Sequence, residues 1–429
     1  MRKKHMFPES NSERIVIIGG GFAGINLAKS LSNTAYQVVL LDKQNYHAFQ
    51  PLLYQVSTFG LEPDSIAYPL RKLLNKADNL YFKLAEVTSI NCDQKQIHSN
   101  IGKINYDKLV ICTGTKINFF GNDAIKKHAY WMKSVSQALN LRSRILENLE
   151  KASNAVDEEE KKALLRFVIA GAGPTGVELC GALGELKQHI FKEDYPEFDS
   201  DDIEIILLEG QSRVLPVMSK TSSQNAENYL KKLSVKVITD VMVTNYDGFE
   251  VKTNQDEVFS TYNFIWSAGV KGATVEGLDQ DAIVKHRYKV NEFHEVENAK
   301  DIYALGDIAL MQTSAFPDGH PQVAQPAIQQ AKNLANNFKA ALKNKKPKAF
   351  EYFDKGTMAT IGRHKAVVDL NKTTLSGTIA WYIWMLVHLW FLVGFRNRII
   401  TFANWIYNYI KYDKGARLII RKSKPTAKL

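Results

Sequence analysis

Residues 15–24 read Ile-Val-Ile-Ile-Gly-Gly-Gly-Phe-Ala-Gly, an apolar run that ends in a glycine-rich turn. The run is typical of a buried strand, and the residues after it have the pattern of a helix. Gly19, Gly21 and Gly24 allow a tight turn, close approach of the backbone to a pyrophosphate and close packing of helix on strand. The stretch predicts a βαβ unit that binds a dinucleotide with its phosphates at the helix N-terminus.

A second stretch of the same kind begins at Phe167. The apolar run Phe167-Val-Ile-Ala is followed by Gly171, Gly173 and Gly176, which repeat the spacing of the first loop. One glycine loop alone can be no more than a tight turn between a strand and a helix. Two such loops in one chain predict two dinucleotides that meet, and therefore electron transfer between them.

Each loop has an acidic partner at the end of a second strand. Asp42 ends Gln37-Val-Val-Leu-Leu-Asp42, and Glu209 ends Ile203-Glu-Ile-Ile-Leu-Leu-Glu209. A carboxylate at this place can accept hydrogen bonds from a ribose 2′-OH. Glu209 would repel a 2′-phosphate, which favours NADH over NADPH, although Arg213 close by leaves that preference open. Three further strand ends are expected to contact the cofactors: Thr113-Gly114, Ala268-Gly269 and Gly306-Asp307.

The order of strand and helix patterns predicts an α/β fold with parallel sheets, in which one Rossmann-like domain is inserted into another. The expected boundaries are 1–130 with 292–345 for the first dinucleotide-binding domain, 131–291 for the second, and 346–429 for a C-terminal membrane-association domain.

The three cysteines are Cys92, Cys112 and Cys180, and no two of them form a C-x-x-C pair. This argues against a disulfide scaffold, a zinc ribbon and a dithiol redox centre, so no metal site is predicted. The first nine residues contain basic side chains but no apolar run, unlike a secretory signal. A cytoplasmic setting is expected.

The net charge of +10 is concentrated in the C-terminal part of the chain. From Asn371 onward the sequence has ten basic residues and a single acidic residue, Asp413, which gives a net charge of +9. The body of the protein is therefore nearly neutral, and nucleic acid is not expected as a partner.

Residues 376–395 contain no charged side chain, and the stretch is long enough to cross a bilayer. Its tryptophans, tyrosines and His388 suit a membrane interface better. In the next segment apolar and polar residues fall on opposite helical faces: Ile399, Phe402, Ala403, Ile406 and Ile410 against Thr401, Asn404 and Asn408. We expect amphipathic helices that lie in the membrane surface, with basic residues toward an anionic leaflet. A true span, an oligomer interface and a buried core are the alternatives.

Four stretches together resemble the type II (non-proton-pumping) NADH:quinone oxidoreductases, flavoproteins with two dinucleotide-binding domains. These stretches are Gly19–Gly24, Asn45-Tyr-His-Ala-Phe-Gln-Pro-Leu-Leu-Tyr-Gln-Val56, Gly171-Ala-Gly-Pro-Thr-Gly-Val-Glu178 and Ala324-Gln-Pro-Ala-Ile-Gln-Gln330. The resemblance implies that FAD binds the first domain and NADH the second. It places Asp42 at the FAD ribose, Asp307 at the ribityl chain, and Pro51 and Leu52 near the isoalloxazine.

The resemblance also implies a quinone site lined by Gln325 and Gln329, and a homodimeric, peripheral respiratory enzyme at the cytoplasmic face of the cell membrane. Glu178 and Lys365 are candidates for delivering protons to the quinone. Glu178 could instead complement the helix dipole, Lys365 could be a surface lysine, and the glutamine pair could serve helix packing.

Three other functions are compatible with the same fold. A sulfide:quinone oxidoreductase needs a pair of redox cysteines, and no cysteine lies in the C-terminal half of this chain. A soluble ferredoxin or rubredoxin reductase leaves the apolar tail unexplained. A flavoprotein similar to apoptosis-inducing factor, with an interaction role, would turn over NADH and quinone slowly. The choice between ubiquinone and menaquinone stays open.

Overall fold

The computed structural model describes residues 7–8, 10–75, 77–371, 373–411 and 415–419, without side chains for 408–411. The expectation about the first nine residues falls largely outside this range. So do six of the basic residues of the tail: Lys372, Lys414, Arg421, Lys422, Lys424 and Lys428.

The described residues divide into two compact units. The first is drawn from Met1–His47, Tyr68–Lys116 and Val270–Asp354. The second is drawn from Ala48–Ala67, Ile117–Gly269 and Lys355–Leu429.

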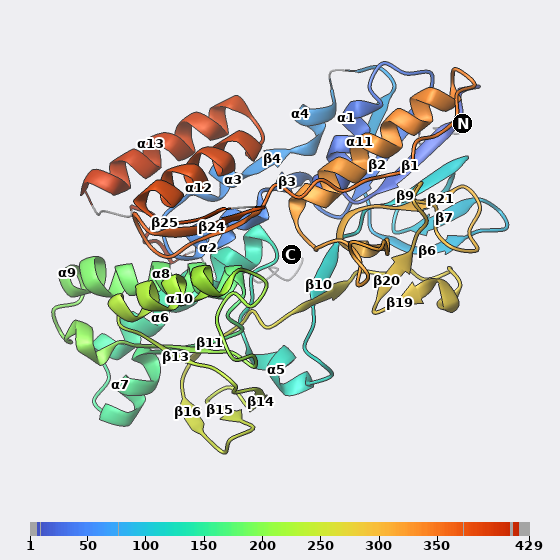
Figure 1. Ribbon diagram of the computed structural model, residues 1–429. Helices are drawn as coiled ribbons and strands as arrows, with labels where there is room; N and C mark the ends of the chain where they lie inside the picture. The colour runs from blue at the N-terminus through green and yellow to red at the C-terminus, as the bar shows by residue number, and fades with distance from the viewer. Residues whose placement is uncertain (1–6, 9, 76, 372, 412–414, 420–429) are drawn as a thin grey trace, which may run out of the picture. The chain divides into compact units, whose positions relative to one another are not determined.

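The first unit is built on a five-stranded parallel sheet in the order β21-β9-β1-β2-β5 (Figure 1). Its strands are β1 (Arg14–Ile18), β2 (Gln37–Asp42), β5 (Leu80–Leu84), β9 (Lys108–Ile111) and β21 (Ile302–Ala304). The central strands are almost wholly buried, as expected for a parallel sheet covered on both faces. Helix α1 (Phe22–Ser30) follows β1 and packs against α11 (Ala324–Ala341). The predicted βαβ unit is therefore confirmed.

Two small three-stranded sheets also belong to the first unit. One is antiparallel and consists of β6 (Val87–Asn91), β7 (Gln96–Ser99) and β8 (Gly102–Asn105). The other consists of β19 (Ile283–Val284), β20 (Arg287–Lys289) and β22 (Ala309–Leu310).

The second unit repeats the parallel arrangement with four strands in the order β13-β12-β11-β17. These strands are β11 (Arg166–Ala170), β12 (Glu204–Leu208), β13 (Val235–Ile238) and β17 (Asn263–Trp266). The helices of this part are α6 (Val135–Ser153), α7 (Glu158–Leu165), α8 (Pro174–Leu186) and α10 (Lys220–Lys232). An antiparallel sheet is made of β14 (Val243–Tyr246), β15 (Glu250–Thr253) and β16 (Val258–Ser260). The second βαβ unit is confirmed as well.

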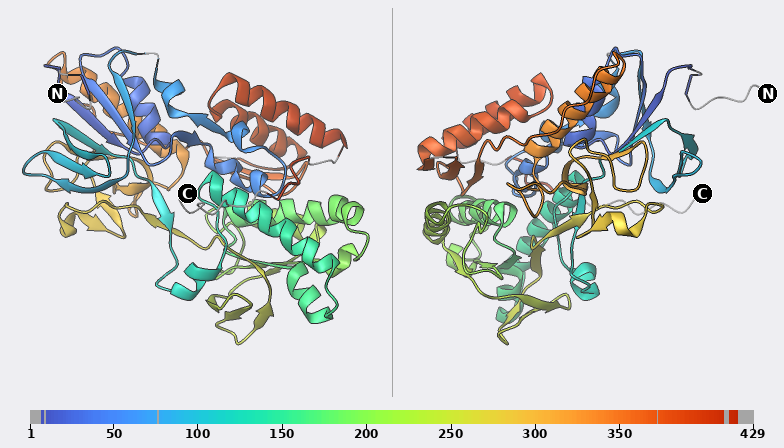
Figure 2. Two further views of the ribbon diagram at one scale, coloured as in Figure 1. Left: turned by 180° about the vertical axis from the view of Figure 1, so that it is seen from behind. Right: turned by 45° about the vertical axis from the view of Figure 1, so that its right-hand side comes forward.

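The C-terminal part of the second unit is an antiparallel sheet followed by two helices. The strands are β23 (Thr357–Thr360), β24 (Ala366–Leu370) and β25 (Thr373–Gly377), and the helices are α12 (Thr378–Phe391) and α13 (Phe395–Lys411). The two helices lie side by side in all views (Figures 1 and 2). The segment from Ala48 to Ala67 supplies the short helices α2 (Leu53–Ser57) and α3 (Pro63–Ile66), and α3 packs against α13.

The uncharged stretch 376–395 is not one helix. Helix α12 ends at Phe391, and Gly394 has a φ of +94°, which separates it from α13. At 1.5 Å per residue, a helix as short as α12 covers roughly 20 Å, less than the hydrocarbon core of a bilayer. Among the described residues, none of the helices combines the length and the apolar character that crossing a membrane requires.

The remaining short elements are α4 (Leu70–Leu74), α5 (Asp123–His128), α9 (Lys192–Asp194), β3 (Tyr46–Ala48), β4 (Ala67–Pro69), β10 (Thr115–Ile117), β18 (Val270–Gly272) and the turns η1 (Gln50–Leu52), η2 (Lys187–Phe191), η3 (Ser200–Asp202), η4 (Gln280–Ala282) and η5 (Gly306–Ile308).

Candidate functional site

The first glycine loop joins β1 to α1 and is packed tightly against backbone. Gly19 has a φ of +105°, and a Cβ on it would lie 2.3 Å from the carbonyl oxygen of Cys112. A Cβ on Gly24 would lie 1.8 Å from the carbonyl oxygen of Gly19, so helix and loop need glycine at both places. A Cβ on Gly21 would meet no described neighbour within 4 Å. The open side at Gly21 leaves the start of α1 accessible to a phosphate group.

Asp42, at the end of β2, holds this loop in place. Its Oδ2 accepts a hydrogen bond from the backbone N–H of Gly20 at 2.5 Å, and its Oδ1 accepts one from Gln44 at 2.7 Å. Burial raises the pKa of Asp42, and the two backbone donors offset part of that rise. Beyond the end of β9, the buried hydroxyl of Thr113 has no hydrogen-bond partner among the described residues. An open phosphate cradle, a carboxylate at the ribose position and an unsatisfied hydroxyl fit a bound FAD.

The strand end that carries Asp307 is fixed by a glutamine of helix α11. Gly306 has a φ of +73°, and its N–H donates to Oε1 of Gln330 at 2.7 Å. Gln330 is only 1% exposed, which makes this amide a buried structural anchor. Thr115 Oγ1 lies 3.4 Å from Oδ2 of Asp307. Sequence reasoning quoted the motif that contains Gln330 but assigned it no role; the signal was its place next to Gln329.

The second glycine loop, between β11 and α8, repeats the first in detail. Gly171 has a φ of +101°, and a Cβ on it would lie 2.6 Å from Cα of Ala268. A Cβ on Gly176 would lie 2.0 Å from the carbonyl oxygen of Gly171, whereas a Cβ on Gly173 would meet no described neighbour within 4 Å. Gly269, after β17, has a φ of +152°. Loop and strand end thus lie together and leave one open side for a ligand.

Glu209 holds the second loop as Asp42 holds the first. Its Oε2 accepts a hydrogen bond from the N–H of Ala172 at 2.6 Å, and its Oε1 accepts one from Gln211 at 2.9 Å. The guanidinium of Arg213 donates to the carbonyl oxygen of Pro216 at 2.7 Å. The carboxylate therefore lies at the loop, where a bound ribose would be expected.

The other predicted site residues are divided between the units. Gln325 and Gln329 are on α11 in the first unit, and Glu178 and Lys365 are in the second. The amide of Gln329 exchanges two hydrogen bonds with the backbone of Phe353, at 2.9 and 3.1 Å. Pro51 and Leu52 form the turn η1 of the second unit, where Leu52 is fully buried.

Glu178 is buried in helix α8, and its Oε1 accepts a hydrogen bond from the N–H of Thr360 at 3.4 Å. Burial raises the pKa of Glu178 to about 8, and the Thr360 amide and the Trp384 indole offset only part of that rise. The group is therefore a neutral acid near pH 7, a state suited to proton transfer. The Lys365 ammonium lies over the ring of Tyr229, 5.7 Å from its centroid.

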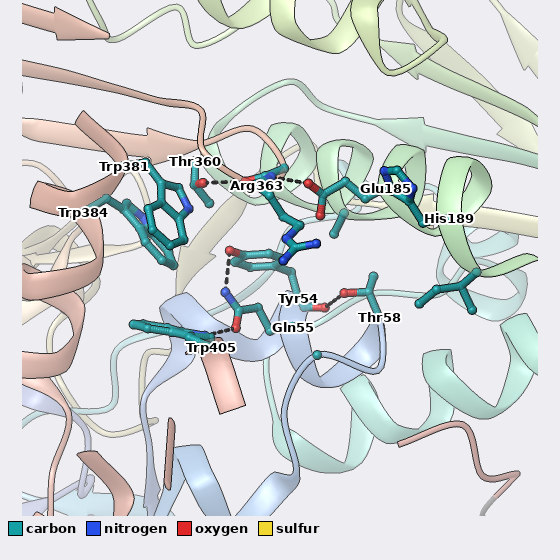
Figure 3. A pocket seen from close by; sticks show the side chains of 14 residues that line it. Tyr54, Gln55, Thr58, Glu185, His189, Thr360, Arg363, Trp381, Trp384 and Trp405 are labelled. Carbon is teal, nitrogen blue, oxygen red and sulfur yellow. Dashed lines mark hydrogen bonds between the residues drawn. The ribbon is translucent and has the colours of Figure 1, made fainter. Parts of the chain in front are cut away.

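A pocket of about 90 Å³ lies within the second unit (Figure 3). Its aromatic lining comes from α2, α12 and α13: Tyr54, Trp381, Trp384 and Trp405. Sequence reasoning placed the tryptophans of the tail at the membrane interface, and for Trp384 this is wrong. Trp384 is 1% exposed, because it packs against His388 and Trp405 with ring centroids 4.1 and 5.4 Å away. Burial of the His388 imidazole lowers its pKa to about 4, so the ring is neutral near pH 7.

The polar side of the pocket is formed by Glu185, His189 and Arg363. Glu185 accepts a hydrogen bond from the backbone N–H of Arg363, which ties α8 to the loop after β23. His189 belongs to the π-helical turn Lys187–Phe191. Such turns are rare and frequently occur at functional sites. An aromatic wall opposite charged side chains suits a flat ring that carries polar oxygens.

Helix α13 buries its polar face and exposes its apolar face. Asn397 and Thr401 are 3% and 0% exposed, whereas Phe395, Ile399 and Phe402 are exposed. Asn397 Nδ2 donates to the carbonyl oxygen of Ala67 at 3.0 Å. Helix α12 also leaves a row of large apolar side chains exposed: Ile379, Tyr382, Leu386 and Trp390. This orientation is the reverse of that expected for a helix facing water. Of the predicted faces, the side chains of Asn408 and Ile410 lie outside the described residues.

Comparisons with known proteins agree with this architecture. Residues 13–331 match the family model described as pyridine nucleotide-disulphide oxidoreductase, and residues 355–411 match the NDH2 C-terminal domain. A type II NADH:quinone oxidoreductase of Mycobacterium tuberculosis is 37% identical, over 94% of this chain and 89% of that protein.

Two solved structures share the fold. NDH2 of Plasmodium falciparum, in complex with NADH, has a TM-score of 0.88 at 24% identity, covering 96% of this chain and 100% of its own. The sulfide:quinone oxidoreductase of Aquifex aeolicus has a TM-score of 0.72 at 19% identity, covering 93% and 96%. In the present chain all three cysteines are free, and burial raises the pKa of the Cys112 and Cys180 thiols.

The predicted family is thus confirmed by a match over most of the chain, by a relative more than one-third identical, and by a match to the NDH2 C-terminal domain. This chain belongs to the type II NADH:quinone oxidoreductases, flavoenzymes that oxidise NADH with a quinone.

Proposed function

We propose that the first glycine loop holds FAD and the second holds NADH, with 1–130 and 292–345 as the FAD domain, 131–291 as the NADH domain and 346–429 as the membrane-association domain. The observation that supports two dinucleotide sites is the paired geometry of the loops: Gly21 and Gly173 face open space, and a carboxylate is hydrogen-bonded to each loop. Which loop holds FAD and which holds NADH follows from the family resemblance. Bound in the first loop, FAD would supply the two-electron redox chemistry that links NADH oxidation to quinone reduction. The protein's own residues bind and orient the cofactor and the two substrates, and they supply protons to the quinone.

The remaining loop residues complete the proposed cofactor contacts. On the FAD side these are Thr113, Gly114, Gly306, Asp307, Pro51 and Leu52. On the NADH side they are Ala268 and Gly269 with Glu209. The proposed action of Gln325, Gln329 and Lys365 at the quinone rests on the family resemblance alone, since none of them is among the residues that line the aromatic pocket.

The position of Glu209 predicts a preference for NADH over NADPH. Replacing Glu209 with glutamine removes the charge but keeps one oxygen that can accept a hydrogen bond from the loop. We expect the ratio of kcat/KM for NADH to that for NADPH to fall about tenfold, because like-charge repulsion of the 2′-phosphate is lost. Steady-state assays with both nucleotides measure this ratio, and an unchanged ratio removes Glu209 from the ribose site.

We propose that the aromatic pocket of the second unit receives the quinone ring and that Glu178 supplies a proton as the quinol forms. Quinone rings are flat and apolar with two carbonyl oxygens, which matches the aromatic wall and the charged side of the pocket. The backbone N–H of Thr360, which binds Glu178, belongs to a residue that lines the pocket. A buried acid that is neutral near physiological pH can donate a proton, and the resulting carboxylate can then be reprotonated from solvent.

Replacing Glu178 with glutamine tests this role. The wild-type rate of quinone reduction is expected to fall as pH rises through about 8, where the proton leaves Glu178, and the variant is expected to lack this limb. Rates measured from pH 6 to 9 with a short-chain quinone would show it. A variant with the same limb as the wild type places the titrating group elsewhere.

The stability of the same variant gives an independent control. Between the ordinary pKa of 4.5 and the pKa of about 8 in the folded protein, the folded state keeps a proton that the unfolded state has released. The free energy of unfolding therefore falls with rising pH in this window, by at most about 1.4 kcal/mol per pH unit. Glu178→Gln is expected to flatten this slope, as measured by Tm between pH 5 and 8.

We propose further that the exposed apolar rows of α12 and α13 rest in the membrane surface at the cytoplasmic face of the cell membrane. Arg396 is exposed beside these rows, and its guanidinium forms an ion pair with the exposed carboxylate of Asp64 at 3.2 Å. The excess of basic residues in the tail is proposed to favour anionic lipid headgroups. The resemblance also predicts a homodimer. Light scattering of the detergent-purified protein distinguishes the 48.5 kDa chain from a species of twice that mass.

A further inference from the structure

A hydrogen-bond chain runs along the wall of the aromatic pocket (Figure 3). The indole Nε1 of Trp405 lies 2.7 Å from Oε1 of Gln55, and Nε2 of Gln55 lies 2.9 Å from the hydroxyl oxygen of Tyr54. All three residues line the pocket and belong to the second unit. These hydrogen bonds join helix α13, whose outer face is apolar and exposed, to helix α2.

The direction of every hydrogen bond in this chain is set by Trp405. An indole N–H can only donate, so the atom of Gln55 that faces it must be the carbonyl oxygen. The amide nitrogen of Gln55 then faces Tyr54 and must donate, so the Tyr54 oxygen is the acceptor. The phenolic O–H of Tyr54 remains, and the structure gives it no acceptor among the described residues. Figure 3 shows this hydroxyl directed toward Trp381 and Trp384.

Tyr54 is held in the protonated state. Its side chain is 6% exposed, and burial raises its pKa well above the ordinary value. At the high pH where a tyrosine would ionise, Glu178 is a carboxylate, and its charge raises the pKa of Tyr54 further. A ligand oxygen in the pocket would accept the hydrogen bond for which this buried donor has no described acceptor.

The indole is held in this orientation by the helix that carries it. Asn397, Thr401 and Trp405 are spaced four residues apart and point to one side of α13. Asn397 binds the carbonyl oxygen of Ala67, and Thr401 Oγ1 lies 3.5 Å from that of Ser65. The helix is therefore docked on the segment that contains Tyr54 and Gln55.

We propose that the Tyr54 hydroxyl donates a hydrogen bond to a carbonyl oxygen of the quinone, and that Gln55 and Trp405 are positioning residues that leave this proton free to do so. The inference rests on the proposed function, in which the quinone ring occupies this pocket. A hydrogen bond to the carbonyl favours charge on that oxygen as electrons arrive, so it strengthens during reduction.

Three substitutions each interrupt the series of hydrogen bonds from Trp405 to Tyr54 at a different point. Tyr54→Phe removes the donor. Trp405→Phe removes the group that orients the amide. Gln55→Glu supplies a carboxylate, which only accepts, so the Tyr54 proton turns to it and away from the pocket. Each is expected to lower kcat/KM for a short-chain ubiquinone about three- to thirtyfold, with unchanged flavin content and unchanged flavin bleaching by NADH. Trp131→Phe, a tryptophan away from the pocket, is the matched control and is expected to have no effect.

The double variant separates positioning from a general effect on packing. If Trp405 acts through Tyr54, then Trp405→Phe adds nothing further in the Tyr54→Phe background. Full additivity of the two losses, or unchanged quinone kinetics in Tyr54→Phe, overturns the inference.

A pocket-filling variant tests the proposed quinone site separately. Ala182 lines the pocket, and Ala182→Leu is expected to reduce quinone turnover while flavin bleaching by NADH persists. If it does so but Tyr54→Phe has no effect, the quinone site stands and the hydrogen-bond inference fails. If Ala182→Leu leaves quinone turnover unchanged, the site fails and the inference fails with it.

Discussion

A triple variant in which serine replaces Trp390, Phe395 and Ile399 is expected to have a partition coefficient onto phospholipid vesicles about a thousandfold lower than that of the wild type. These side chains are 75%, 78% and 51% exposed, so serine costs the fold little. Burying a large apolar side chain in an apolar medium contributes about 1.5–3 kcal/mol. Three of them amount to about 4 kcal/mol or more, and each 1.4 kcal/mol is roughly a tenfold change in affinity.

Co-sedimentation with neutral and anionic vesicles measures this effect. The matched control is serine at Val156, Val217 and Val258, which are exposed elsewhere in the same unit. Unchanged vesicle binding by the first variant contradicts a membrane role for this surface. If its mass in detergent falls by half instead, the surface is an interface between two copies of the chain.

Alanine at Gly173 is expected to lower kcat/KM for NADH about ten- to a hundredfold while the protein keeps its flavin. The backbone here is extended, with a φ of −68°, and the added methyl group meets no described neighbour within 4 Å, so folding is unaffected. The methyl occupies the side of the loop to which a pyrophosphate must come close. One extra methyl group in a binding site typically weakens ligand binding by about 1–3 kcal/mol.

Alanine at Gly21 is the counterpart in the other loop, where φ is −72° and the space is equally open. Here the purified protein is expected to have lost flavin absorbance. Gly415→Ala, also in open space but outside both loops, is the control and should retain both properties. The assignment of the two loops is contradicted if Gly173→Ala loses flavin, or if Gly21→Ala keeps it at full occupancy with normal affinity.

The glycine loops could be predicted from the sequence because their function is a property of the local backbone. Gly19 and Gly171 have positive φ, and a Cβ on Gly21 or Gly173 would meet no described neighbour within 4 Å, so residue type and spacing carry the information. The carboxylates Asp42 and Glu209 were found for the same reason, since a strand of known length places them at the loop.

The aromatic pocket could not be predicted, because it depends on contacts between distant segments. A composition window shows Trp384 and Trp390 as equivalent, yet one is 1% and the other 75% exposed. The break at Gly394 reorients the chain inside a run that looks continuous. The hydrogen bond from Trp405 to Gln55 joins residues 350 positions apart, and only the folded structure reveals it.

Electron transfer from NADH through a bound flavin to a quinone is tested most directly by anaerobic stopped-flow absorbance. The detergent-purified protein is mixed first with NADH and then with a short-chain ubiquinone, while the flavin absorbance is followed. We expect rapid bleaching by NADH and rapid recovery on adding the quinone. Bleaching without recovery, or no flavin absorbance at all, would contradict the account.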